Sequence, residues 1–275
     1  MNPAQIPFLL YGTAWKEAQT AALTELALRA GFRGIDTANQ RRHYHEAGVG
    51  QGLATAYRDG VATRADLFLQ TKFTDVAAQD ERLPYDPRAD LAAQVSQSLS
   101  SSLEHLGTDY VDSLLLHGPQ SHRGWTGADD RIWGAMIRER DAGRTRRIGV
   151  SNVTLRHLQQ LLERSAQRPA FVQNRCFART GWDRDVRAFC RAHDIVYQGF
   201  SLLTANPDVL REPLVLRIAA REGATPAQVV FRFAIGVGML PLTGTGDPQH
   251  MQQDLQAAAL SLTDDELRAI ERIRG

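Results

Sequence analysis

Short apolar runs alternate with longer amphipathic segments along the whole chain. The short runs are predicted to be β-strands: Phe8–Gly12, Gly34–Asp36, Leu67–Lys72, Val111–His117, Arg147–Val150, Phe171–Gln173, Ile195–Gln198 and Met239–Thr243. The segments between them repeat apolar residues every three or four positions, which predicts helices. These helices cover Ala18–Ala30, Ala47–Arg58, Pro87–Leu106, Asp129–Asp141, Thr154–Arg164, Asp183–His193, Val215–Glu222, Pro226–Ile235, Gln249–Ala258 and Asp264–Arg274. Eight strands with helical connections favour a (β/α)8 barrel, the TIM barrel of the α/β class, over a doubly wound sheet.

Turn-forming residues support several of these helix ends. Gly31 and Gly143 follow predicted helices as C-caps, and Ser151–Asn152 is a candidate cap before the helix at Thr154. The stretch Ser201–Pro213 is expected to be irregular. No linker or composition break divides the sequence, so we predict one domain over residues 1–275.

The length of 275 residues suits one such barrel, for which about 250 residues are typical. The net charge is only +1, so the sequence gives no general attraction to nucleic acid or to a membrane surface. The arginines at Arg41–Arg42 and Arg144–Arg147 are expected to be solvated turns. We therefore expect a small-molecule ligand, and a monomer.

The cysteine content and the N-terminal sequence suggest a compartment. Cys176 and Cys190 are the two cysteines, and both are expected to be structural. The start, MNPAQIPFLL, has neither a basic n-region nor a long apolar stretch, and no run approaches the roughly 20 apolar residues that span a bilayer. These features predict a cytoplasmic location.

Three polar residues stand at the ends of consecutive predicted strands: Asp36, Lys72 and His117. Strand C-termini converge on one face of such a barrel, where active sites are built. Taken singly, each has an ordinary alternative: a cap or salt bridge for Asp36, a rim lysine for Lys72 and a structural role for His117. Taken together, and with Tyr44 eight residues after Asp36 as a candidate proton donor, they predict the active site of an enzyme.

A tyrosine with its free pKa of about 10 is a poor acid near neutrality. We expect the Lys72 ammonium to favour the Tyr44 phenolate, the Asp36 carboxylate to hold that lysine, and the His117 imidazole to hydrogen-bond and orient a substrate oxygen.

Seven segments in barrel-strand order resemble the aldo-keto reductase family: YGTAW, GFRGIDTA, LQTKF, LLLHGP, IGVSN, FVQN and TGTGDPQHM. The resemblance covers nearly the whole chain. It implies a (β/α)8 barrel that binds an extended nicotinamide cofactor, usually NADPH, without a G-x-G-x-x-G motif. No such motif follows the first predicted strand.

The family's catalytic aspartate, lysine and histidine correspond to Asp36, Lys72 and His117. Its tyrosine usually lies five residues after the aspartate, where this chain has Arg41. An insertion before Tyr44 would restore the match, because the following EAGVG resembles the start of the family's next helix. We therefore expect Tyr44 to be the proton donor; otherwise Tyr44 is a loop aromatic and catalysis is altered or lost.

The resemblance also implies which residues bind the cofactor. Ser151, Asn152 and Gln173 correspond to side chains that hold the nicotinamide carboxamide, and Phe200 to the aromatic residue that stacks on the ring. The remaining expected cofactor contacts are Gly12, Thr13, Ala14, Ser201, Leu203, Gly244, Thr245, His250 and Asp254. The resemblance implies NADPH as the cofactor. Gly244 and His250 stand where lysine and arginine often hold the 2′-phosphate, so NADH is possible as well.

The expected substrate contacts beside Tyr44 are Trp15, His45 and Trp125, although Trp125 could instead pin its loop to the barrel. The sequence thus predicts NADPH-dependent reduction of aldehydes or ketones in an open pocket. Two alternatives stay open: a nicotinamide-binding protein with weakened catalysis, and a metal-dependent hydrolase that uses His43 and His45.

Overall fold

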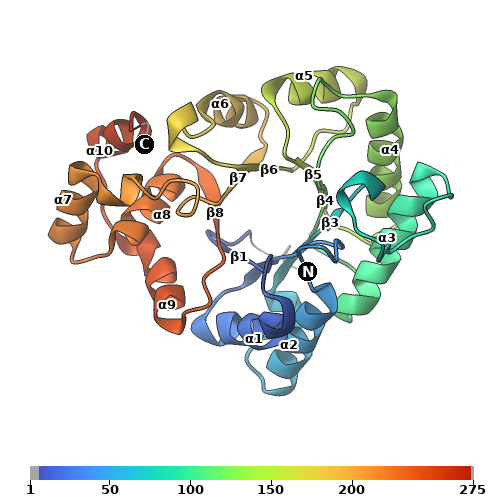
Figure 1. The fold of residues 1–275 in the computed structure, drawn as a ribbon, viewed down its shortest axis with the longest axis horizontal. Helices are drawn as coiled ribbons and strands as arrows, with labels where there is room; N and C mark the ends of the chain where they lie inside the picture. The colour runs from blue at the N-terminus through green and yellow to red at the C-terminus, as the bar shows by residue number, and fades with distance from the viewer. Residues whose placement is uncertain (1–5, 274–275) are drawn as a thin grey trace.

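The computed structural model describes residues 6–273 and shows a closed barrel of eight parallel strands (Figure 1). The strands are β1 (Leu10–Gly12), β2 (Gly34–Asp36), β3 (Phe68–Phe73), β4 (Ser113–Leu116), β5 (Ile148–Ser151), β6 (Phe171–Arg175), β7 (Val196–Phe200) and β8 (Met239–Thr243). Each strand pairs with the next, and β1 pairs with β8 to close the ring. The predicted (β/α)8 barrel is confirmed.

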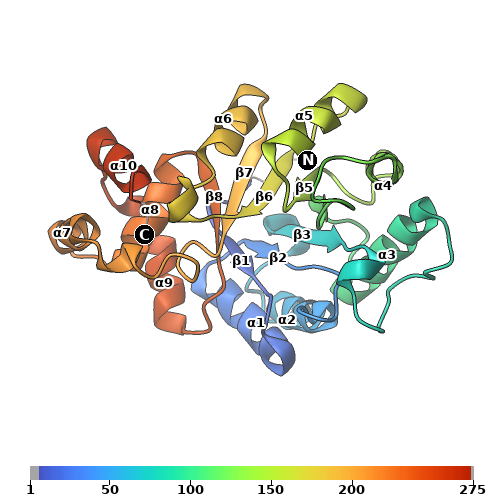
Figure 2. The same ribbon diagram turned by 45° about the horizontal axis from the view of Figure 1, so that its top comes forward.

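Helices surround the strands on all sides, as the turned view also shows (Figure 2). Within residues 6–273 they are α1 (Thr20–Ala30), α2 (Glu46–Arg58), α3 (Leu91–Leu106), α4 (Gly127–Asp141), α5 (Leu155–Arg164), α6 (Arg184–Ala192), α7 (Pro213–Glu222), α8 (Pro226–Gly236), α9 (Pro248–Gln256) and α10 (Asp264–Glu271). Helices α7 and α10 lie outside α8, at the periphery of the barrel (Figure 1).

Local sequence explains where several helices begin and end. The Asp90 and Thr126 side chains accept hydrogen bonds from the first turns of α3 and α4. Gly31 closes α1 with φ +115°, a backbone conformation that L side chains rarely adopt. Helix α5 is capped by Thr154 rather than by the predicted Ser151–Asn152, which leaves those two residues at the end of β5.

The barrel interior is apolar at one end and polar at the other. Six buried side chains form the apolar cluster: Leu10, Phe68, Leu115, Phe171, Leu240 and Leu242. The rings of Phe68 and Phe171 meet edge to face with centroids 5.5 Å apart. Towards the C-terminal ends of the strands, the interior positions instead hold the polar residues Asp36, Gln70, Lys72, Gln173 and Gln198.

Most predicted elements occur at the expected places, and the differences lie at their ends. Strands β6 and β7 continue two residues beyond the prediction, to Arg175 and Phe200, because these residues pair in register with each other. Helix α3 begins at Leu91 rather than Pro87. The predicted end of the last helix at Arg274 lies outside the described residues. No helix between residues 6 and 273 combines the length and apolarity needed to cross a bilayer.

A buried ion pair joins the barrel wall at the end opposite the polar layer. The carboxylate of Asp112, which is 0% exposed, accepts from Arg64, Arg146 and the Leu69 amide at 2.9–3.0 Å. We expect Asp112→Ala to lower the free energy of unfolding by about 3 kcal/mol, because it removes the one carboxylate that accepts from both guanidinium groups and from the amide. Urea unfolding measures the change. The exposed Asp109→Ala is the control, and an equally small effect of both variants would contradict the prediction.

Candidate active site

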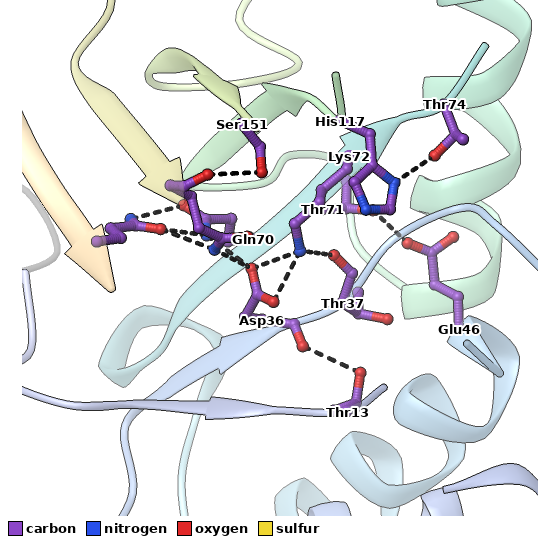
Figure 3. Close-up of polar contacts among 12 residues, drawn as sticks. Thr13, Asp36, Thr37, Glu46, Gln70, Thr71, Lys72, Thr74, His117 and Ser151 are labelled. Carbon is purple, nitrogen blue, oxygen red and sulfur yellow. Dashed lines mark hydrogen bonds and ion pairs between the residues drawn. The ribbon is translucent and has the colours of Figure 1, made fainter. Parts of the chain in front are cut away.

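A buried lysine and a buried aspartate form the centre of the polar layer (Figure 3). Asp36 ends β2, and Lys72 lies on the neighbouring strand β3. The Lys72 ammonium donates to both Asp36 carboxylate oxygens at 2.7 Å and to the Thr37 carbonyl oxygen at 2.8 Å. The two residues are 1% and 3% exposed, so the pair is almost fully removed from water. Asp36 and Lys72 therefore lie in contact, as the sequence predicted.

Three glutamines surround the same carboxylate, and sequence analysis had identified one of them, Gln173. The amide nitrogens of Gln70 and Gln173 donate to Asp36 Oδ1 at 2.7 and 3.0 Å, and both donate to Gln198 Oε1. Gln70 and Gln198 could have been found from the sequence, because each is a polar residue within an otherwise apolar strand, LFLQTK and IVYQGF. The network fixes the Asp36 carboxylate against the lysine.

Tyr44 lies beside the lysine despite the unusual spacing from Asp36. The loop turns back on itself, since the His43 and Tyr44 amides both donate to the Gln40 carbonyl oxygen. This turn places the Tyr44 ring centre 5.3 Å from the Lys72 ammonium and 6.0 Å from the centre of the His117 ring. The loop therefore brings together the four residues predicted as catalytic.

Burial and the Lys72 charge shift the pKa of Tyr44 in opposite directions. Burial raises the pKa of Tyr44, and the Lys72 ammonium only partly offsets this rise. The Lys72 ammonium thus favours the phenolate, as expected, but burial outweighs it in the net shift. Burial alone would lower the pKa of Lys72, but the Asp36 carboxylate and Tyr44 together raise it. At neutral pH the lysine is charged and the tyrosine is a neutral phenol.

His117 directly follows β4 and is neutral. Burial, followed by the nearby Lys72 and His43, lowers its pKa to about 3. Its Nδ1 lies 2.7 Å from the hydroxyl of Thr74, which is itself 1% exposed. If Thr74 donates this hydrogen bond, the imidazole hydrogen is on Nε2, the tautomer that can donate to a substrate oxygen.

A cavity of about 850 Å³ opens above these groups. Its volume falls in the upper part of the range of about 300–1,000 Å³ found for small-molecule sites. The expected cofactor residues that line it are Gly12, Ala14, Ser151, Asn152, Gln173, Phe200, Ser201, Leu203, Gly244, Thr245, His250 and Asp254. Thr13 lies behind the wall, where its hydroxyl donates to the Asp36 carbonyl oxygen.

The expected substrate residues divide into two groups. Trp15 lines the cavity, is 70% exposed and packs on His43 with ring centres 4.2 Å apart. His45 does not line this cavity, because it is the N-cap residue directly before α2 and faces a smaller cavity. Trp125 is 4% exposed and donates to Asp130, so it pins its loop, as the alternative interpretation had it.

The large cavity also contains residues that sequence analysis missed. The Lys16 ammonium contacts the Gly244 carbonyl oxygen across the barrel mouth. Arg175, Thr225 and Gln253 line other parts of the wall. Lys16 directly follows the quoted YGTAW segment. Arg175 was missed because the predicted strand ended at Gln173, whereas β6 continues to Arg175.

The predicted metal alternative has no geometric support. His43 packs against Trp15 with the two rings tilted, whereas His45 Nδ1 lies 3.4 Å from the Glu17 carbonyl oxygen. The two imidazoles thus face different cavities. Within residues 6–273, no group of three or more His, Cys, Asp or Glu side chains is arranged to hold a metal ion.

Comparisons with known proteins agree with this geometry. The sequence profile of the Aldo/keto reductase family matches residues 10–206. This chain belongs to the aldo/keto reductase family. An aldo-keto reductase of Mycolicibacterium vanbaalenii is 34% identical over 256 residues, covering 93% of this chain and 82% of that protein.

Solved structures give the same result. An aldo/keto reductase from Brucella melitensis is 28% identical, with a TM-score of 0.80 over 97% of this chain and 95% of its own. A Bombyx mori aldo-keto reductase in complex with NADP is 27% identical, with a TM-score of 0.82 over 98% of this chain and 89% of its own. As a family member, the protein is an NAD(P)H-dependent oxidoreductase that acts on carbonyl compounds.

A second buried carboxylate ties the tyrosine loop of this reductase to the barrel (Figure 3). Glu46 begins α2, two residues after Tyr44, and is 4% exposed. Its carboxylate accepts from the Thr71 hydroxyl on β3 and lies 3.2 Å from Nδ1 of His105 on α3. The start of α2 is thus attached to the strand that carries Lys72.

We expect Thr74→Val to lower kcat for carbonyl reduction roughly three- to tenfold, the kinetic equivalent of a hydrogen bond worth ~0.5–1.5 kcal/mol. The reason is that His117 loses the partner that selects its tautomer. Steady-state kinetics measures the change, and cofactor affinity should not move. Thr74→Ser, which keeps the hydroxyl, is the control; equal losses in both variants would argue against a tautomer effect.

The Glu46–His105 pair predicts a pH dependence of stability. The hydrogen bond that His105 donates to the Glu46 carboxylate raises the pKa of His105 above its ordinary 6.5. His105 therefore binds its proton more tightly in the folded protein than in the unfolded chain. The stabilisation from the charged pair is complete below pH 6.5, the pKa of the unfolded chain, and is lost as pH rises through the raised pKa of the folded protein.

We expect the stability difference between the wild type and His105→Ala to shrink between about pH 6 and about pH 8. Urea unfolding at fixed salt across this range measures it, with the exposed His122→Ala as the control. A difference that stays constant or grows with pH would show that the charged pair is not the source.

Proposed function

We propose that the protein reduces aldehydes or ketones to alcohols with NADPH as the preferred cofactor and Tyr44 as the general acid. The observation that carries this proposal is the convergence of Tyr44, Lys72, Asp36 and His117 beneath one large cavity. We also propose that the protein acts in the cytoplasm. Its cysteines, Cys176 and Cys190, are buried and unpaired, which suits a reducing compartment.

The wall of the cavity fits a nicotinamide. Gln173 Oε1 accepts no hydrogen bond from the described residues, although the Gln173 amide nitrogen is fully engaged, so this oxygen is free to accept from a carboxamide. Ser151 and Asn152 lie beside it, and Phe200 offers an aromatic face. These four residues would hold the ring, which supplies the hydride when it is bound.

The adenosine end of the cavity is less selective. Thr245 and His250 are available to a 2′-phosphate there. However, the Asp247 carboxylate already accepts from the Gln249 and His250 amides at the start of α9, where a phosphate would otherwise bind. We therefore propose that NADPH is preferred, on family grounds, and that NADH is also accepted.

The protein's own residues account for the proton transfer. Tyr44 donates its phenolic proton to the developing alkoxide, and the phenolate that remains is stabilised by the Lys72 ammonium. Asp36 keeps that ammonium charged and in place. His117 donates from Nε2 to the carbonyl oxygen and so aligns it with the tyrosine. Asn152 supports this alignment by donating to the His117 carbonyl oxygen at 2.7 Å.

We expect Tyr44→Phe to lower NADPH oxidation with 4-nitrobenzaldehyde by a factor of about 10²–10⁴, since it removes the general acid but keeps the ring. Absorbance at the NADPH band measures turnover, and quenching of tryptophan fluorescence measures cofactor binding, which should persist. Activity like that of the wild type would refute the role of Tyr44.

The same assay tests the weakened-catalysis alternative. If the wild type binds NADPH but reduces none of a panel of aldehydes and ketones, the protein is a cofactor-binding relative with altered catalysis. Repeating the panel with NADH measures the proposed cofactor preference.

A further inference from the structure

Arg175 is an exposed cation on the wall of the large cavity and has no acidic partner among the described residues. It is the last residue of β6 and points its side chain into the site. Arg164, Arg184, Arg187 and Arg211 each lie within 4 Å of a carboxylate, whereas none of the ion pairs in residues 6–273 includes Arg175 or Arg179.

The strand register fixes the height of Arg175 above the catalytic groups. Side chains two residues apart on a strand share a face and are separated by about 7 Å. Gln173 lies on that face and contacts Asp36, so Arg175 lies one repeat above the polar layer, towards the mouth. Phe200 is its register partner on β7, and the guanidinium lies 5.6 Å from that ring centre.

The surroundings favour an anion at this position. The ring of Phe200 holds the guanidinium through a cation–π contact that leaves its N–H donors unoccupied. Across the mouth, the other unpaired cation of the wall, Lys16, already donates to the Gly244 carbonyl oxygen. A planar guanidinium in a partly apolar, concave wall is suited to bidentate binding of an oxyanion.

We propose that Arg175 forms an oxyanion-binding subsite, which rests on the proposed function in that its ligand enters the reductase cavity. The oxyanion is either a carboxylate on the carbonyl substrate or the diphosphate of the nicotinamide cofactor. The first source makes acidic aldehydes the favoured substrate class, and the second makes Arg175 a cofactor clamp. Both the substrate carboxylate and the cofactor diphosphate would accept hydrogen bonds from the N–H groups of the Arg175 guanidinium.

The test compares Arg175→Met, which keeps the unbranched stem but removes the charge, with the wild type. The control is Arg179→Met, because Arg179 also packs on an aromatic ring, that of Phe177 at 4.4 Å, but lies outside the cavity. Calorimetry measures binding of NADPH and of 4-carboxybenzaldehyde. Steady-state kinetics then compares 4-carboxybenzaldehyde with its neutral analogue methyl 4-formylbenzoate.

A substrate carboxylate predicts that Arg175→Met weakens binding of 4-carboxybenzaldehyde and raises its KM about tenfold or more, while the ester and NADPH are unchanged. A cofactor diphosphate predicts that NADPH binding weakens by a similar factor and that both aldehydes suffer equally. The proposal is overturned if Arg175→Met matches Arg179→Met in every measurement.

Failure of the proposed function has a different signature. In that case the wild type turns over neither aldehyde. The calorimetric binding measurements still show whether Arg175 holds an oxyanion.

Discussion

The ion pair between Lys72 and Asp36 is the interaction on which the site depends. Both charges are almost fully buried, and removing such charges from water costs several kcal/mol per ion unless every donor and acceptor is satisfied. The structure meets this requirement with the Thr37 carbonyl oxygen on the ammonium and with two glutamine amides on the carboxylate. The pair therefore requires a specific set of polar residues around it, contributed by β2, β3, β6 and β7.

That requirement explains the division of the barrel interior into two halves. The six large apolar side chains fill one end and exclude water from beneath the ion pair. The glutamine layer lies directly above them and connects opposite walls, since Gln198 bonds to both Gln70 and Gln173. The site is thus rigid at its floor and open at its mouth, where loops and strand ends contribute Trp15, His43 and Arg175. Positions near the floor are constrained by the ion pair, whereas those at the mouth are free to set ligand preference.

The sequence predicted the barrel and the floor of the site well, because both follow from strand periodicity. Asp36 and Lys72 end apolar runs, and parallel strands in a barrel bring such ends together without any knowledge of the loops. Among the predictions that depended on loop paths, Tyr44 was found beside Lys72, whereas two expected substrate residues were not found in the cavity. His45 and Trp125 were expected in the substrate site because they are aromatic and close in sequence to catalytic residues. Their actual positions depend on the start of α2 and on the contact with Asp130, which periodicity does not encode.

The direction of the Tyr44 shift was also beyond the sequence, because it depends on the depth of burial as well as on the charges nearby. The direction of the shift bears on the proposed reaction. A raised pKa keeps the phenol protonated at neutral pH, which is the form that must give a proton to a carbonyl oxygen. The buried ammonium matters most after that transfer, when it faces a phenolate at low effective dielectric and the attraction is far stronger than in water. In the proposed reaction, burial and charge would therefore act on different states of the same residue: burial would hold the proton before the transfer, and Lys72 would lower the energy of the anion that remains.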